Sequence, residues 1–299
     1  MMTLDINIRT AAMNHLNKLK SVYGDIIPHS ELRKGFQYFS ETIHLISQQG
    51  IFKPSQLDLP LTISSTFNGP YNDDIGDEYI SYKYRGNDPS FVDHRDNTGL
   101  RNVMNSSLPL IYFHGVEIGR YVPIYPVFIV NDNPKKMTFT LAADDIKVVL
   151  SSTVEDESSQ QGRRKYVTRE VKTRLHQSSF RAIIMKAYKD QCSICRLKHP
   201  RLLDAAHIIP DSEPTSSSNI DNGLSLCKIH HSAFDQSIIG ITPDYIIKVR
   251  TDILEEIDGP MLKHGIQEMH NKSLFTPSSK NKKPSKNSLD WRYQRFLSA

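Results

Sequence analysis

Two pairs of metal-ligating residue types constrain the C-terminal third of this sequence more than any other feature. The first pair is Cys192 and Cys195 in the segment CSIC, and the second is Cys227 and His230 in the segment CKIH. Together they supply three thiolates and one imidazole, a donor set typical of tetrahedral zinc sites. No other cysteine occurs in the chain, and buried structural cysteines would not explain why every one stands at ligand spacing. A site closed by four protein ligands leaves no open position, so zinc here is expected to stabilise the fold.

The other features of the sequence argue against a secreted or membrane protein. An odd number of cysteines without a signal peptide does not suit a disulfide framework. The N-terminus MMTLDINIRT contains Asp5 and lacks the apolar core of a secretion signal. The longest apolar stretch, 121–130, is interrupted by Pro123 and Pro126, so no transmembrane helix is expected. We therefore expect a cytoplasmic protein.

The length of 299 residues suggests about two domains. Near the N-terminus, Ala12, Leu16 and Leu19 follow a helical spacing that predicts a helix over 7–23, and a second helix is expected over 30–48. From residue 50 the pattern changes to short β-rich runs separated by turn residues. These runs lie at 61–67, 78–84, 108–115, 120–130 and 136–142. The sequence thus predicts a compact β-rich domain with flanking helices over 1–150.

A polar, serine-rich segment follows this domain and predicts a linker over 151–165. The C-terminal domain is then expected over 166–299, beginning with a helix at 166–190 that leads into the first cysteine pair. The segment PSSKNKKPSKNS is low in apolar residues and predicts an extended stretch, after which DWRYQRFL could dock as a short helix. The expected fold class of the whole chain is α+β.

A dense block of positive charge begins at the end of the predicted linker. Between Arg163 and Arg201 the sequence has twelve Lys or Arg residues against two acids. Such a density beside a candidate active site is expected for a protein that binds a polyanion. The alternative is a solvated helix face without a partner. The residues chosen as candidate phosphate contacts are Arg163, Arg164, Lys165, Arg174 and Arg181.

Three segments within and after the ligand pairs carry a more specific signal. They are LLDAAHIIP at 202–210, NIDNGLSLC at 219–227 and HHSAFD at 230–235. In this order, inside a zinc-ligand frame, they resemble the HNH endonuclease family over about residues 188–249. The resemblance implies a ββα-metal fold, in which two short antiparallel strands and a helix surround one divalent ion at the scissile phosphate.

The resemblance also implies roles for three residues. His207 matches the general base, and an imidazole suits that role because its ordinary pKa lies near operating pH. Asn222 matches the central Asn, which fixes the loop and orients the base. Taken alone, an Asn before Gly223 is also an ordinary turn residue. His231 matches the histidine that binds the catalytic ion, while His230 is assigned to zinc.

Two carboxylates are candidates for the remaining ligands of the catalytic ion. Asp235 lies four residues after His231, so on a helix both share one face, although Asp235 could equally be a surface acid. Many family members have His or Asp immediately before the base, where this chain has Ala206; we assign the missing ligand to Asp204, which alternates onto the same strand face. Hard oxygen ligands suit Mg2+ or Mn2+, which would act by Lewis-acid stabilisation.

The N-terminal region carries a second resemblance. The segments YKYRGNDP, HRDNTGLRNVM and LPLIYFHGVEIGRYVPIYPVFIV lie in this order between residues 82 and 130. Their order resembles the SRA domains of the PUA-like superfamily, which implies a β-barrel that extrudes a base into an aromatic pocket. Candidate pocket residues are Tyr82, Tyr84 and Tyr112, unless these strand aromatics simply fill the core.

These observations lead to one main hypothesis and two alternatives. The main hypothesis is a metal-dependent HNH endonuclease that hydrolyses double-stranded DNA as a restriction enzyme, with dependence on a base modification left open. The first alternative is a nonspecific effector nuclease controlled by an N-terminal sensor domain. The second is a non-catalytic zinc-module DNA-binding protein, although zinc binding alone requires neither His207, Asn222 nor His231. A double-strand cut from one active site needs a dimer or two encounters, which makes a homodimer a reasonable expectation.

Overall fold

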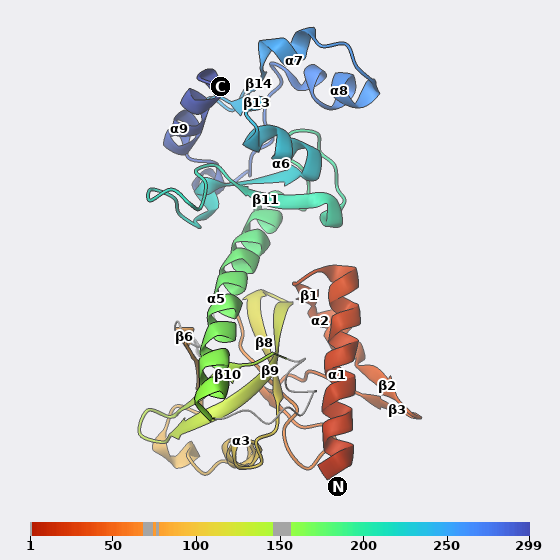
Figure 1. Cartoon of the computed structure of the whole chain (residues 1–299), viewed down its shortest axis with the longest axis vertical. Helices are drawn as coiled ribbons and strands as arrows, with labels where there is room; N and C mark the ends of the chain where they lie inside the picture. The colour runs from red at the N-terminus through yellow and green to blue at the C-terminus, as the bar shows by residue number, and fades with distance from the viewer. Residues whose placement is uncertain (1, 68–73, 76–77, 146–156) are drawn as a thin grey trace. The chain divides into compact units, whose positions relative to one another are not determined.

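The structure is a computed structural model that describes residues 2–67, 74–75, 78–145 and 157–299 (Figure 1). It divides into two compact units, Met1–Ser178 and Ser179–Ala299. Helices and sheets occur in both, so the predicted α+β class is confirmed. Among the described residues, none of the helices combines the length and the apolar character that crossing a membrane requires.

The first unit begins with the helix α1, Met2–Tyr23, which confirms the predicted N-terminal helix. Its residues Ile8, Ala12 and Leu16 are buried in the core of this unit, as their helical spacing predicts. The helix ends at Gly24, which has a φ of 77° and whose amide donates to the carbonyl oxygen of Lys20 at 2.9 Å. Glycine suits this position because a left-handed backbone has no steric cost for it.

The second predicted helix, over 30–48, is wrong for most of its length. Only α2, His29–Lys34, is helical, and it is followed by a hairpin of β2, Phe36–Tyr38, and β3, Glu41–Ile43. The chain leaves the helix at Gly35, whose φ is 69°. A Cβ atom at Gly35 would lie only 2.2 Å from the carbonyl oxygen of Ile43. The close approach of these two backbone segments overrides the weak helical preference of the sequence.

A curled sheet forms the body of the first unit and contains strands from all five predicted β-rich runs. The hydrogen-bonded order is β4-β5-β8-β9-β10-β7-β6, with β1 paired to β9. The β5–β8 pair is parallel and the other pairs are antiparallel. The strands are β1 Ile27–Pro28, β4 Ile51–Phe52, β5 Thr62–Ser64, β6 Asp74–Ile75, β7 Ile80–Lys83, β8 Leu110–Glu117, β9 Arg120–Asn133 and β10 Thr138–Ala143.

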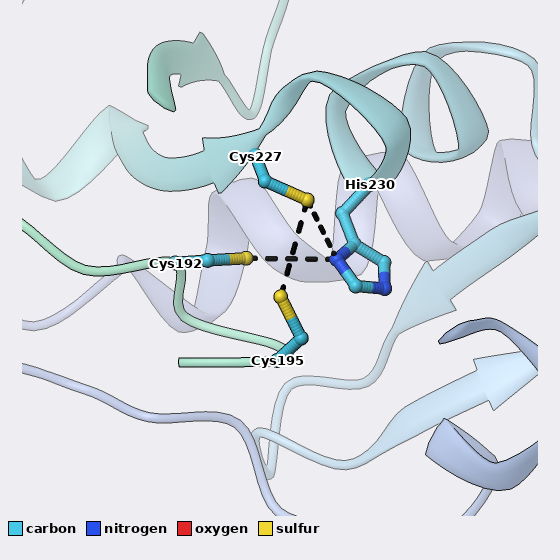
Figure 2. Close-up of side chains that lie close together, drawn as sticks. All are labelled: Cys192, Cys195, Cys227 and His230. Atoms are coloured by element: carbon cyan, nitrogen blue, oxygen red, sulfur yellow. Dashed lines mark hydrogen bonds between the residues drawn. The ribbon is translucent and has the colours of Figure 1, made fainter. Parts of the chain in front are cut away.

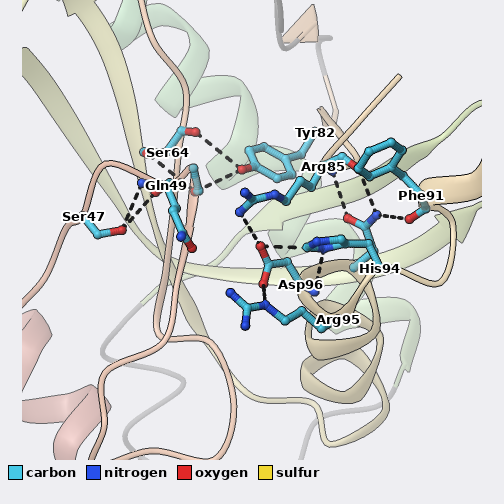
Figure 3. Close-up of polar contacts among 11 residues, drawn as sticks. Ser47, Gln49, Ser64, Tyr82, Arg85, Phe91, His94, Arg95 and Asp96 are labelled. Carbon is cyan, nitrogen blue, oxygen red and sulfur yellow. Dashed lines mark hydrogen bonds and ion pairs between the residues drawn. The ribbon is translucent and has the colours of Figure 1, made fainter. Parts of the chain in front are cut away.

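The helix α3, Arg95–Asn105, follows the short 3-10 helix η1, Pro89–Phe91, and is joined by buried polar contacts to the loop that follows β7. The buried side chain of Asn97 accepts from the amide of Arg85 at 2.9 Å and donates to the carbonyl oxygen of Phe91 at 2.7 Å. Figure 3 shows Arg85, Phe91 and the ion pair between Arg85 and Asp96, whose closest atoms are 2.6 Å apart. An amide that satisfies buried backbone groups in this way holds the loop before α3 in one conformation.

The helix α5, Glu157–Ala187, begins nine residues before the helix expected from the sequence. It therefore takes in part of the predicted linker at 151–165, whose first residues, 151–156, lie outside the described residues. Two arginines near its start, Arg163 and Arg164, both bind the carboxylate of Asp144, whose side chain is fully buried. The division between the two compact units falls after Ser178, within this helix.

The second unit contains the predicted ββα arrangement. The strands β11, Leu203–His207, and β12, Gly223–Cys227, pair antiparallel, and α6, Lys228–Asp235, follows directly. A second hairpin is formed by β13, Ile239–Ile241, and β14, Ile247–Val249. The remaining elements are η2 Pro200–Leu202, η3 Ile220–Asn222, α7 Thr251–Glu255, α8 Pro260–Gly265, η4 Gln267–Met269, η5 Lys280–Lys282 and α9 Lys286–Leu297.

The C-terminal helix α9 packs against the rest of the second unit, as the sequence suggested. Leu289 is fully buried, and Phe296 packs over Gly240 of β13. A Cβ atom at Gly240 would lie 2.5 Å from the ring of Phe296, so the glycine provides the space for this ring. The helix also begins beside the ββα motif, because the amide of Ser285 donates to the carbonyl oxygen of Asp221 at 2.8 Å.

Candidate metal centre and active site

The two ligand pairs converge in the second unit, as their spacing predicted. The ligand atoms of Cys192, Cys195, Cys227 and His230 all lie within 4.8 Å of one another (Figure 2). The first two cysteines stand on a tight turn in which the amide of Arg196 donates to the carbonyl oxygen of Cys192 at 3.0 Å. Sulfur atoms of Cys195 and Cys227 are 3.9 Å apart, so they form no disulfide. Four inward-facing donors at this separation could hold a metal ion.

The orientation of His230 identifies its ligand atom. Its Nδ1 lies 3.1 Å from the sulfur of Cys227 and 3.6 Å from that of Cys192. Its Nε2 lies 2.7 Å from the carbonyl oxygen of Gly265 at the end of α8. A carbonyl can only accept a hydrogen bond, so Nε2 carries a proton, and in the neutral ring the lone pair of Nδ1 faces the thiols. A backbone carbonyl that fixes the ring in this way is a common partner of metal-binding histidines.

The metal centre lies at the joint between strand and helix of the ββα motif. Cys227 is the last residue of β12 and pairs with Leu203 of β11, and α6 begins at the next residue. The first ligand turn is fastened to the same strand, because the amide of Ser193 donates to the carbonyl oxygen of Ser225 at 2.7 Å. Any ion bound here would therefore hold the strand, the helix and the first cysteine turn together.

His207, the predicted base, stands at the end of β11 and is half-buried. Its ring stacks on Phe180 with centroids 4.0 Å apart and an angle of 6° between the planes. Burial lowers the pKa of His207; Asp211 acts in the opposite direction, and the nearby charge of His231 lowers the pKa further. The neutral form, which a general base requires, is thereby favoured.

Asn222 is hydrogen-bonded to the loop that follows His207. Its side-chain oxygen accepts from the amide of Ile209 at 2.9 Å, and its side-chain nitrogen donates to the carbonyl oxygens of Ile209 at 3.1 Å and Ser217 at 2.8 Å. The side chain is almost completely buried. Because both ends of the amide bind backbone of the 208–217 loop, Asn222 fixes the exit of the chain from β11.

His231 lies between the two predicted carboxylates. Oδ2 of Asp204 is 3.3 Å from its Nδ1, and Oδ2 of Asp235 is 3.3 Å from its Nε2. Asp204 also accepts from Lys228 at 2.7 Å and lies 3.5 Å from Arg181. Burial raises the pKa of Asp204, but hydrogen bonds from Lys228 and His231 outweigh this effect and hold the pKa below its ordinary value. The structure thus brings one imidazole and two carboxylates together.

Arg292 of α9 also contacts this group of side chains, and no pattern in the sequence predicts that contact. Its guanidinium donates to the carboxylate of Asp235 at 3.1 Å and to the carbonyl oxygen of Phe234 at 3.0 Å, and it lies 4.6 Å from the centre of the Phe234 ring. The side chain is only 12% exposed. It comes from a segment more than fifty residues away in the sequence, which no local pattern connects to the motif.

The five candidate phosphate contacts have different surroundings. Arg163 and Arg164 lie 2.6 Å and 2.8 Å from the buried carboxylate of Asp144, so both guanidinium groups neutralise that buried charge. Lys165 pairs with the exposed Glu78 at 2.9 Å. Arg174 is exposed beside a cavity of about 240 Å³, and Arg181 donates to the carbonyl oxygen of Pro200 at 3.0 Å.

The three tyrosines proposed for a base pocket are core residues. Tyr82, Tyr84 and Tyr112 are exposed by 6% or less. The hydroxyl of Tyr82 donates to the carbonyl oxygen of Gly50 at 3.2 Å (Figure 3), that of Tyr84 binds Asp132, and that of Tyr112 lies 2.9 Å from the hydroxyl of Ser65. Because the rings are buried and the hydroxyls have partners within the protein, the structure favours the alternative that these aromatics fill the core.

Comparison with known proteins agrees with the motif. Residues 192–242 match the family described as HNH endonuclease, which confirms the resemblance for this segment. No curated protein sequence matches the chain.

Similar solved structures include three proteins, all at low global similarity. The modification-dependent TagI restriction endonuclease has a TM-score of 0.32 and 17% identity, over 84% of this chain and 86% of that one. The SRA domain of SUVH5, in complex with methylated CHH DNA, has a TM-score of 0.25 and 22% identity, over 37% and 86%. The Type IV phosphorothioation-dependent restriction endonuclease ScoMcrA has a TM-score of 0.23 and 15% identity, over 62% and 54%.

Proposed function

We propose that this chain is a metal-dependent DNA endonuclease of the restriction type, in which the second unit cuts and the first unit selects the substrate. The observation that carries the proposal is the arrangement of His207, Asn222 and His231 in one ββα motif that a separate Cys3His group holds together. A zinc module that only binds DNA requires none of these three residues. Their combination suits hydrolysis of a phosphodiester bond.

In the proposed mechanism His207 takes the proton from the attacking water. Its Nε2 is buried, so we assign Nδ1 as the accepting atom. The stack on Phe180 and the loop held by Asn222 keep this atom in one place. A neutral imidazole with a lowered pKa can accept a proton at neutral pH.

His231 with Asp204 or Asp235 would hold Mg2+ or Mn2+, because a nitrogen and hard carboxylate oxygens suit either ion. Such an ion supplies Lewis-acid stabilisation of the phosphate and of the leaving oxygen. The two carboxylates approach opposite nitrogens of the ring, so we propose that one joins the ion while the other orients the imidazole. Zinc is the proposed ion of the Cys3His group, where three thiolates favour it.

Double-stranded DNA is the proposed partner. Lys165 and Arg174 remain proposed phosphate contacts of α5. Arg181 contacts Asp204, so a phosphate bound by Arg181 would lie beside the proposed catalytic group. A second function is favoured by a cavity of about 970 Å³ in the first unit, whose lining combines apolar residues with polar ones that include Gln49, Asp93 and Arg95. A small molecule bound there would make this a nonspecific nuclease under the control of a sensor. Homodimerisation would allow both strands to be cut.

Cleavage of matched duplexes with and without modified bases tests the proposal. We expect zinc-loaded protein to cut in the presence of Mg2+ or Mn2+, to remain inactive when neither is added, and to prefer one class of duplex. Omitting the divalent ion is preferable to a chelator, because a chelator would also remove zinc. Equal cleavage of all duplexes would favour the sensor hypothesis. Tight DNA binding without hydrolysis under any of these conditions would favour the zinc-module alternative.

Arg292 gives a second test, directed at the catalytic ion. We expect Arg292→Gln to raise the Mg2+ or Mn2+ concentration needed for half-maximal cleavage by about 10- to 100-fold, because the carboxylate of Asp235 loses the partner that orients it. The matched control is Arg295→Gln on the same helix, whose guanidinium contacts Trp291 and Glu213 and does not contact the Asp235 carboxylate. An unchanged metal requirement in Arg292→Gln would show that Asp235 needs no such support.

A further inference from the structure

The ring of His207 stacks on the ring of Phe180, while its buried Nε2 makes no hydrogen bond within the described part of the chain. The ring lies almost parallel to that of Phe180, with the two centroids 4.0 Å apart. Phe180 belongs to α5 and is only 3% exposed. The ring of Phe180 therefore restrains the orientation of the His207 imidazole, as the carbonyl group of Gly265 restrains that of His230.

The surroundings of Phe180 keep its own ring in place. Gly223 is the residue of β12 directly opposite His207 in the β11–β12 ladder. A Cβ atom at Gly223 would lie 2.8 Å from Cζ of Phe180 and 2.2 Å from Cδ1 of Ile184. The glycine thus lets two side chains of α5 approach the strand closely, and Ile184, fully buried, stands one helical turn beyond Phe180. Phe180 is enclosed at its far end and has little freedom to turn away from the imidazole.

We propose that Phe180 is a positioning residue for cleavage: it holds the imidazole of His207 in the orientation in which Nδ1 faces the attacking water. This inference rests on the proposed role of His207 as the base. Phe180 lies outside the segment 192–242 that matches the HNH family, so the base is oriented by a helix that precedes the motif. Without the aromatic face the imidazole has no hydrogen bond on Nε2 to restrain it, and it can turn about its side-chain torsions.

The test is a comparison of Phe180→Leu with Ile184→Val in the full-length, zinc-loaded protein. Both changes remove buried apolar atoms beside Gly223, but only the first removes the ring that stacks on His207. We expect Phe180→Leu to lower kcat by about 10- to 100-fold, because small misplacements of a catalytic group have effects of this size. KM and DNA affinity should remain near those of the parent protein. Ile184→Val should keep kcat within about twofold of the parent value, since the imidazole is untouched.

A spectroscopic measurement reports on the contact independently of activity. In protein labelled at its twelve histidines, the ring protons of His207, assigned with His207→Asn, should be shifted upfield by the Phe180 ring current. The shift should disappear in Phe180→Leu and persist in Ile184→Val. If Phe180→Leu does not fold, Phe180→Met replaces it, because an unbranched flexible side chain fills the same space without an aromatic face.

The outcomes separate the inference from the function on which it rests. Loss of the upfield shift together with the fall in kcat supports the positioning role. Loss of the shift with unchanged kcat overturns it, because the base would then work without the stack. An equal fall of kcat in Phe180→Leu and Ile184→Val also overturns it, since a general loosening of the core would explain both. If the parent protein shows the shift but cuts no DNA, the proposed function fails while the contact itself is established.

Discussion

Replacing His207 with alanine is expected to lower the rate of DNA cleavage by about 10²- to 10⁴-fold while zinc content and DNA affinity stay near those of the parent protein. The reason is that His207 is the proposed proton acceptor and contributes no ligand to the Cys3His group. A positioned general base contributes about 10²- to 10⁴-fold to a rate, so the loss should be of that order. Cleavage of a labelled duplex under single-turnover conditions, with binding measured separately, gives both quantities.

His264→Ala is the matched control for this prediction. His264 is exposed on α8, where it pairs with Glu268, and is no part of the proposed catalytic group. The same substitution there should leave the rate unchanged. Loss of folding together with activity in His207→Ala would instead identify a structural histidine. His207→Asn, which retains a planar polar side chain, would then show whether the fold or the chemistry is at fault.

The pH dependence of the parent protein bears on the same residue. Burial lowers the pKa of His207 from its ordinary value of 6.5. A base must be neutral to act, so activity should fall as the pH drops through the lowered pKa. The acid limb of kcat is therefore expected below pH 6.5, and a limb well above that value would argue against His207 as the group that titrates.

The Cys3His group and the ββα motif could be predicted because the residues that define each of them lie close together in the sequence. Two residues between paired ligands suffice to define a tight turn, and the His207, Asn222 and His231 segments fall within one short stretch of sequence. The pairing of β11 with β12 and the convergence of the four ligands follow that order. Spacing of this kind reports on structure because covalent geometry limits how far apart the ligands can be.

The features that the sequence did not predict correctly depend on contacts between residues that lie far apart in the sequence. The helix expected over 30–48 ends at Gly35, where Ile43 crosses the backbone closely. The sequence places Arg163 and Arg164 in a block of positive charge, but it does not indicate that the buried Asp144 lies beside them. The stacking of Phe180 on His207 arises from tertiary packing, and no periodicity in the sequence signals it.

Replacing Cys227 with serine is expected to remove the bound metal and to unfold the second unit. Cys227 ends β12 and directly precedes α6, so its loss frees the joint that supports both His207 and His231. Apparent zinc-binding free energies in small zinc domains are about 10–16 kcal/mol, comparable to or larger than the roughly 5–15 kcal/mol that stabilises a whole domain. Metal analysis should find about one zinc per chain in the parent protein and none in Cys227→Ser. Thermal unfolding should lose the transition of the second unit.

Ser193→Ala provides the control for the zinc prediction, because it changes a buried residue beside the metal ligands, in the first ligand turn between Cys192 and Cys195. Its hydroxyl donates to the carbonyl oxygen of Ser225 at 2.9 Å, but that oxygen also accepts from the amide of Ser193 and keeps a partner. The substitution should therefore cost only about 0.5–1.5 kcal/mol and leave the zinc content unchanged. A parent protein that is stable and free of zinc would contradict the prediction. In that case the cysteines would be buried thiols, and the cohesion of the motif would rest on its apolar core.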